Sequence, residues 1–284
     1  MRLVSLPFPL AMAAAAVIIG VAGTREFPFR HLVEGGFGYF NLMLALFAGA
    51  WSGQAALKSG LADGFAAGLL RLCGVRPLPS LGAIALLLYA AGMFTGLAGV
   101  AVLAVGVFAA PVLRRIGLAA HDAAAFIALE ATCGMIAPPV NVPAMMIADG
   151  VNMPFLNFDR TLLAISLPVA VFAVVLFARR CGARQPAAPE KGVARGALAG
   201  SAPLAAMLGF WLVLRAFPQQ VYDPGVPAVL VAAGLLAVPL LGLRGLRASV
   251  GAAFSGVPVY LAAALIAVGM LVQVMTLTGI RGWV

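Results

Sequence analysis

The chain has 284 residues, of which 63% are hydrophobic and 10% charged, with a mean hydropathy of +1.08 and a formal net charge of +9. A composition this apolar excludes a soluble domain with a single core. The basic residues lie mainly in short segments between apolar stretches, where they act as orientation signals, so the positive charge does not indicate nucleic-acid binding. The sequence therefore predicts an all-α polytopic membrane protein.

Residues 1–180 are predicted to form a first repeat that begins with two spans. The stretch 3–23 is long enough to cross a hydrocarbon core of ~30 Å. Its basic start also fits a cleaved signal peptide, but its small-residue cleavage pattern is poor, so we favour a retained span. Residues 24–36 carry no net charge and predict an outside loop. Residues 37–57 predict the second span, and 61–75 have the spacing of an interfacial or short connecting helix.

Residues 81–113 form a long apolar stretch without charge. A single helix of that length would overshoot the bilayer, whereas two full spans need about 40 residues. Arg76 lies before the stretch, and Arg114 and Arg115 follow it, which predicts that both ends face the cytoplasm. The small residues of MFTGLAG predict a turn. We therefore expect a re-entrant hairpin with its tip at residues 95–99; two short, tilted full spans are the alternative.

Residues 118–150 are apolar enough for the bilayer but contain Pro138, Pro139 and Pro143 in mid-span. Adjacent prolines remove amide donors and force the preceding residue out of helical geometry, which predicts a broken helix. Backbone freed at membrane depth must be buried in protein or line a wet cavity, as at the binding sites of secondary transporters. The alternative is a structural helix with a proline kink.

The rest of the chain is predicted to hold a closing span (161–178), a cytoplasmic linker (181–197), and the start of a second, incomplete repeat (198–284). Its spans are expected at 198–217, 225–243 and 251–279. Aligning residues 40–64 with 259–283 pairs Gln54 with Gln273, and the Ser-Gly-Leu step at 59–61 with the Thr-Gly-Ile step at 278–280. The predicted topology runs the two copies in opposite directions, which indicates an inverted repeat. The second repeat has no hairpin or broken helix of its own, so we expect a truncated chain or elements supplied from elsewhere.

The motifs TGLAGVAVLAVGVFAAPVLRRIG and EATCGMIAPPVNVPAMMIADGVNMPF resemble the large membrane subunit of TRAP transporters, the tripartite ATP-independent periplasmic systems of the ion transporter superfamily. The closing VGMLVQVMTLTGI resembles the start of that subunit's second half. The resemblance implies a bacterial inner-membrane permease that takes a small organic anion, such as a carboxylate, from a periplasmic binding protein with the help of a small membrane subunit. It also implies sodium coupling and an elevator motion of the hairpins and broken helices.

The resemblance extends to individual residues. Gly96, Gly106 and Pro111 fall on the family's hairpin positions, and Thr132, Gly134, Pro138 and Pro139 fall on its broken-helix motif. It thereby implies Na⁺ near Gly96, Thr132 and Gly134. The chain departs from the family at two places. In the hairpin, Leu97, Ala101 and Val105 stand where hydroxyl or amide residues are common, and after the prolines Val140 and Asn141 stand where a small or hydroxyl residue is usual. Losing these side-chain oxygens leaves mainly backbone carbonyls for a hard cation, so the coupling ion and the substrate class stay open.

Glu130 is a second candidate for ion coupling. It lies about 16 Å along the helix from Ala119, close to the midplane. A charge there is costly, so the carboxyl should be neutral, paired or facing water. We expect it either to carry a proton in a proton-coupled cycle or to serve as a hydrogen-bonded structural acid.

The candidate binding residues share the hairpin tip and the break, and they could face one another across one cavity: Thr95, Gly96, Gly99, Glu130, Thr132, Gly134, Pro138, Pro139 and Asn141. Three cysteines without paired spacing and two histidines predict no disulfide framework, metal site or cofactor. No HExxH or GxSxG motif points to an enzyme. The remaining alternative to a permease is a non-transporting assembly subunit or remnant.

Overall fold

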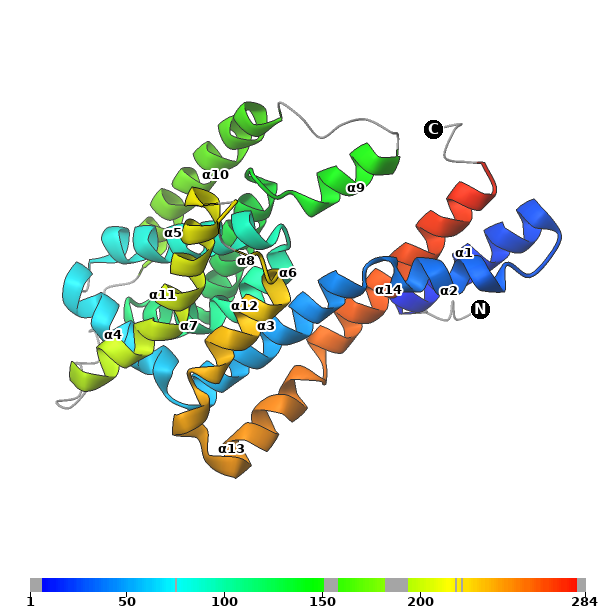
Figure 1. Cartoon of the computed structure of the whole chain (residues 1–284). Helices are drawn as coiled ribbons and strands as arrows, with labels where there is room; N and C mark the ends of the chain where they lie inside the picture. The colour runs from blue at the N-terminus through cyan, green and yellow to red at the C-terminus, as the bar shows by residue number, and fades with distance from the viewer. Residues whose placement is uncertain are drawn as a thin grey trace, which may run out of the picture.

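The computed structural model describes residues 7–74, 76–150, 158–181, 194–217, 219–220 and 222–279. Every regular element in these ranges is an α-helix (Figure 1). In chain order these helices are α1 (Phe8–Thr24), α2 (Phe29–Gly38), α3 (Phe40–Lys58), α4 (Leu61–Cys73), α5 (Pro77–Thr95), α6 (Ala98–Ala104), α7 (Gly106–Arg115), α8 (Ala120–Ile136), α9 (Val142–Gly150), α10 (Asp159–Arg180), α11 (Ala194–Ala216), α12 (Val226–Leu235), α13 (Val238–Ala253) and α14 (Val257–Leu277).

Several helices have the length and composition of membrane spans. Among the described residues these are α3, α5, α10 and the segment Val238–Leu277, which holds α13 and α14. The pair α6 and α7, bent by 62°, would make a fifth span if the two helices cross together. The structure therefore confirms the all-α class expected of a membrane protein.

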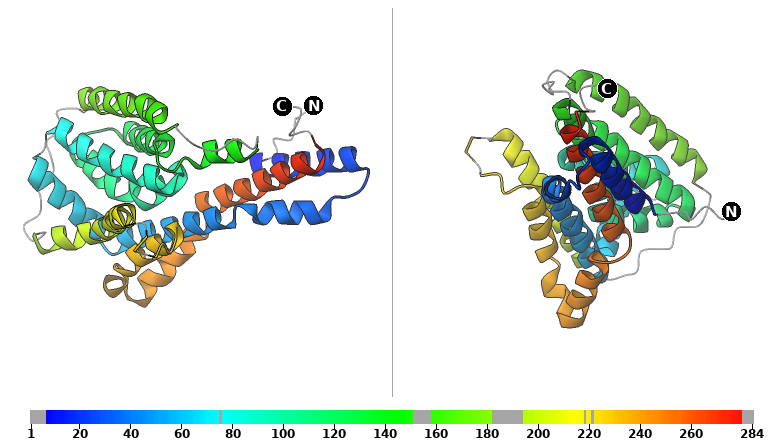
Figure 2. Two further views of the ribbon diagram at one scale, coloured as in Figure 1. Left: turned by 45° about the horizontal axis from the view of Figure 1, so that its top comes forward. Right: turned by 90° about the vertical axis from the view of Figure 1, so that its right-hand side faces the viewer.

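The helices form a body and an arm. Figures 1 and 2 show α1, α2 and the C-terminal part of α14 extending away from the body, with α2 leading into α3. The rings of Phe47 and Phe254 stack at 4.7 Å, and the Gly35 backbone lies against that of Gly269. Phe254 lies directly before α14 and faces Phe47 of α3, whereas Gly269, inside α14, faces Gly35 of α2. Later positions on α14 therefore contact earlier positions on α2 and α3, so α14 runs antiparallel to them.

The body packs α5 closely against α8, and α10 covers both helices. Gly92 and Gly134 lie at the crossing of α5 and α8, where the backbones approach too closely for larger side chains. Phe126 is fully buried and meets Phe177 of α10 edge to face at 5.4 Å. This crossing holds the first limb of the predicted hairpin against the first half of the broken helix.

The predicted interruptions of helix lie close to their expected positions. The chain reverses after α5 at Gly96, which has the left-handed φ of 65°. The first limb begins at Pro77 rather than at residue 81, because prolines suit the first turn of a helix. At 19 residues it is longer than a half-depth limb. The second limb bends again at Val105, between α6 and α7.

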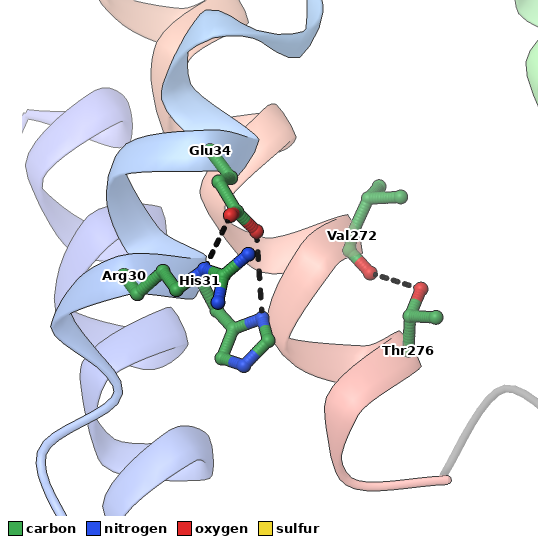
Figure 3. A network of polar contacts seen from close by, with 5 residues as sticks. All are labelled: Arg30, His31, Glu34, Val272 and Thr276. Atoms are coloured by element: carbon green, nitrogen blue, oxygen red, sulfur yellow. Dashed lines mark hydrogen bonds and ion pairs between the residues drawn. The ribbon is translucent and has the colours of Figure 1, made fainter.

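Residues 24–36, predicted to be an outside loop, instead contain the start of helix α2, and that prediction was wrong. Leu32 and Gly35 are buried, and Gly35 packs against α14. On the exposed side Arg30 Nε donates to Glu34 Oε1 at 2.7 Å, and His31 Nδ1 lies 3.8 Å from Glu34 Oε2 (Figure 3). Burial on one face and an i,i+4 pair on the other stabilise the helix.

The predicted span 225–243 is also not a single helix. It is divided between α12, which ends at Leu235, and α13, which begins at Val238 and has a non-helical Gly242 with φ 61°. Pro239 has no amide hydrogen to continue the helix from α12. Arg244 therefore lies inside α13 rather than after a span.

The first helix of each copy of the proposed repeat, α3 or α14, ends in the same local structure. Ser59 and Thr278 have φ of −83° and −81°, and each is followed by a left-handed glycine, Gly60 with φ 77° or Gly279 with φ 71°. Of the predicted linker 181–197, residues 182–193 lie outside the described residues, and 194–197 instead form the start of α11. The alignment beyond residue 279 also lies outside the described residues.

Candidate functional site

The break between α8 and α9 is made by its prolines. Helix α8 ends at Ile136, the Pro138-Pro139 peptide bond is cis, and α9 begins at Val142. Because prolines carry no amide hydrogen, the carbonyls of Gly134 and Met135 lose their i+4 donors. The Gly134 oxygen accepts instead from the Ala137 amide at 3.0 Å. Of the two, only the Met135 carbonyl is thus left without a backbone donor among the described residues.

Asn141 connects the two half-helices. Its Nδ2 donates to the Ile136 carbonyl of α8 at 3.2 Å, and its Oδ1 accepts from the Ala144 amide of α9 at 3.1 Å. The second bond is the usual N-cap contact. Asn141 is only 5% exposed, so this side chain fixes the break from inside the protein.

The hairpin turn meets the break. A Cβ atom built on Gly96 would lie 2.7 Å from Val140 Cγ1, 2.8 Å from Val142 Cγ2 and 3.1 Å from the Val140 carbonyl oxygen. With a left-handed φ as well, only glycine fits this position without strain. The structure therefore brings the two predicted interruptions into direct contact.

The threonines of the candidate site bond to their own helices. Thr95 Oγ1 lies 2.8 Å from the Ala91 carbonyl and 3.2 Å from that of Leu97, and it also accepts from the Leu97 amide at 3.4 Å. Thr132 Oγ1 donates to the Ala128 carbonyl at 2.8 Å. A donating hydroxyl still has an oxygen lone pair that could face a cation.

Two of the candidate glycines serve helix packing. Gly134 faces the backbone of Tyr89 in α5, with no room for a side chain. Gly99 faces Leu261 Cδ1 at 3.4 Å and Leu46 Cδ1 at 3.7 Å, on α14 and α3. These contacts give Gly134 and Gly99 packing roles, whereas Gly96, Asn141 and the half-buried Pro138 and Pro139 make up the junction itself.

Glu130 borders a different space. Its side chain helps to line a cavity of about 320 Å³ between α5 and α10, whose other lining residues are apolar apart from Tyr89. Glu130 is 0% exposed, and neither carboxyl oxygen has a hydrogen-bond partner within the described chain. Burying an unpaired carboxylate is costly, so we expect the neutral acid here.

Two polar residues near Glu130 were missed from the sequence. The Tyr89 hydroxyl and Ser166 Oγ lie 2.8 Å apart in a buried hydrogen bond that joins α5 to α10. The available signal was a hydroxyl near the middle of each of two mainly apolar spans. Sequence spacing alone does not show that the two are partners.

The ion pairs near the start of α8 are structural. Asp122 Oδ1 accepts from Arg180 Nη1 of α10 at 3.0 Å, and Arg115 Nη2 lies 3.5 Å from Asp63 Oδ1 of α4. Within the described residues no group of three or more His, Cys, Asp or Glu side chains is placed to hold a metal ion. A cation at the break would therefore depend on carbonyl and hydroxyl oxygens.

Comparison of the chain with protein-family models, curated proteins and solved structures gave no match.

Proposed function

We propose that the chain is the large permease subunit of a TRAP-type secondary transporter, a multi-pass protein of the bacterial inner membrane. It imports a small organic anion, such as a carboxylate, by ion-coupled alternating access. A periplasmic binding protein delivers the substrate, and a small membrane subunit assists.

The observation that carries the proposal is the contact between Gly96 and the break at Val140 and Val142. Non-helical backbone within apolar spans is costly in lipid and is retained where it forms a binding site. Two such interruptions, from different elements, meet here in the protein interior. A proline kink with a purely structural role gives no reason for the second interruption.

The arrangement of α3 and α14 supports an inverted repeat. Helices α3 and α14 run antiparallel and end in the same hydroxyl and glycine geometry, as the aligned sequences predict. In this proposal α5 and the bent pair α6 and α7 form the re-entrant hairpin. The hairpin and the broken helix move together past the arm helices.

The coupling ion is proposed to be sodium, bound at the junction by the carbonyl oxygens at the end of α8 and by Thr95 or Thr132. Open carbonyl ends of broken helices are the usual sodium ligands in such transporters. The buried, unpartnered Glu130 favours a second candidate, a proton-coupled transporter of the same superfamily. The two candidates differ in the ion that must bind.

Equilibrium binding of ²²Na⁺ to the purified chain in lipid nanodiscs tests the sodium form. We expect saturable binding that excess unlabelled sodium displaces and potassium does not. Gly96→Val should abolish it, because the new side chain pushes Val140 away from the junction. Gly209→Ala is the matched control, since a Cβ at Gly209 meets nothing within 4 Å. An absence of saturable binding would exclude sodium coupling and leave the proton-coupled form.

A further inference from the structure

A cavity separate from the junction lies between α3, the bent pair α6 and α7, α8 and the turn from α13 to α14. Its volume is about 540 Å³, within the range of small-molecule sites. Apolar side chains such as Val107, Ile127 and Pro258 form most of its lining. None of the junction residues Gly96, Pro138, Pro139 or Asn141 takes part.

The cavity has one charged lining residue, Arg114, and no acidic one. Its neighbour Arg115 pairs with Asp63, whereas the Arg114 side chain has no ion pair or hydrogen bond within the described residues. The guanidinium is a planar fork that matches a carboxylate. An exposed and unpaired cation thus lies at the edge of a mainly apolar space.

Two polar side chains accompany Arg114. The Gln54 amide is half-buried in the wall and has no hydrogen bond within the described chain. Ser255 Oγ lies 3.2 Å from the Ala252 carbonyl and donates to it. Gln54 therefore offers two free N–H donors in the wall of the same cavity as Arg114, whereas the Ser255 proton is already used. This donor set suits an anionic oxygen group rather than a cation.

The junction itself offers less to an anion. At the start of α9, Pro143 has no amide hydrogen, and Asn141 already accepts from the Ala144 amide. An organic anion would therefore find its counter-charge at Arg114. We infer that this cavity binds an organic monoanion with an apolar body, its carboxylate held by the Arg114 guanidinium and the Gln54 amide and its body against Val107, Ile127 and Pro258.

The test is calorimetric titration of octanoate into the full chain in phosphatidylcholine nanodiscs, with heats from empty nanodiscs subtracted. Octanol and octylamine serve as the neutral and cationic probes. We expect octanoate to bind at least tenfold more tightly than either. Equal affinity for octanol would overturn the inference, because it would show that the charge contributes nothing.

Variants locate the site. Arg114→Gln should weaken octanoate binding at least tenfold and Gln54→Leu several-fold, whereas Arg115→Gln, which alters the adjacent paired arginine, should leave it unchanged. Ala110→Leu fills the cavity without changing its charge and should also weaken octanoate binding. It therefore tests the location of the site even if Arg114→Gln does not fold. Equal affinities for Arg114→Gln and Arg115→Gln would contradict the assignment, as would unchanged binding in Ala110→Leu.

Nanodiscs that contain phosphatidylglycerol separate a free anion from a lipid headgroup. If the cavity takes free carboxylates, octanoate should retain its affinity there after correction for surface charge, which octanoate partitioning into empty nanodiscs of the same composition measures. Complete displacement by the anionic lipid would overturn the assignment to a carboxylate, because a lipid phosphate would then be the occupant.

Discussion

At the scale of the residue, Asn141 holds the broken helix together. It gives a donor to the last turn of α8 and an acceptor to the first turn of α9, at 3.2 and 3.1 Å. The prolines beside it cannot supply such donors. The side chain thus compensates part of the backbone bonding that the break removes.

Replacing Asn141 with Ala should lower the free energy of unfolding by about 1–2 kcal/mol, because both bonds are lost at a buried position. Asn141→Asp keeps the cap acceptor and loses the donor to Ile136, so its effect should be intermediate at neutral pH. Thermal unfolding in detergent measures both. Wild-type stability in Asn141→Ala would show that the bridge is dispensable.

Glu130 is the residue on which proton coupling depends. The buried acid has no partner for either oxygen within the described chain. Glu130→Gln keeps the shape and removes the titration. We therefore expect a folded variant in which any pH-jump current of the proteoliposomes is lost while a sodium-jump current persists. A Glu130→Gln variant that retained the full pH dependence would leave the carboxyl a structural role only.

Glu34 provides a test outside the spans. The hydrogen bond from the Arg30 guanidinium, together with its positive charge, holds the pKa of Glu34 below its usual range. A carboxyl with a lowered pKa stabilises the fold above its unfolded pKa, and that contribution is lost as the pH falls through the folded value. The melting temperature of Glu34→Gln should therefore be slightly lower than that of the wild type at pH 7, and the two should converge near pH 3. The effect should be small because the pair is exposed. A difference that grew toward low pH would contradict this sign.

At the scale of the element, glycines set the distances between helices. Gly134 of α8 touches the Tyr89 backbone, and Gly92 of α5 would place a Cβ 2.6 Å from the Ala131 carbonyl. A backbone contact cannot move aside as a flexible side chain can. The crossing of α5 and α8 therefore requires small residues on both sides.

Gly134→Ala should destabilise the chain by roughly 1–3 kcal/mol, because the added methyl group overpacks the crossing. Gly82→Ala on the same helix as Tyr89 should not, since its Cβ meets nothing within 4 Å. Comparing folded yield and melting temperature checks the pair. If Gly134→Ala impaired ion binding while folding normally, Gly134 would belong to the site rather than to packing.

The elements also show what the sequence could predict. The breaks at Gly96 and Pro138 depend on local backbone chemistry, and the spans α3 and α10 are continuous apolar runs, so all four were predictable. Helix α2 was not, because its buried face depends on Gly269, far along the chain. Hydropathy did not predict the division of span 225–243, because its residues remain apolar across the break. Pro239 was a local signal of an interruption.

The candidate site was predictable to a similar extent. Gly96 and the prolines could be placed by their backbone roles. Three features arise from tertiary packing: the contact of Gly96 with Val140, the two hydrogen bonds of the Asn141 side chain, and the cavity that Gln54 and Arg114 share. Sequence spacing contains no such information, and so Glu130 was grouped with the break although it borders another cavity.

At the scale of the whole molecule, the arm and the body give the chain two parts that could shift past one another. The arm consists of α1, α2 and the C-terminal part of α14, and the junction between the hairpin and the broken helix lies in the body. The wall of the Arg114 cavity includes residues of α3 and α14 as well as α6, α7 and α8. A movement of the hairpin relative to α3 and the start of α14 would therefore also change this cavity.

Charge displacement by proteoliposomes on a solid-supported membrane tests the central claim most directly. A transporter predicts a saturable transient current when sodium, or in the second candidate the proton concentration, is stepped. The sodium current should survive in Gly209→Ala and disappear in folded Gly96→Val, because sodium is proposed to bind at the junction. If the folded wild-type chain gave no current in either jump, the permease proposal would be contradicted, and a non-transporting assembly subunit would be the better account.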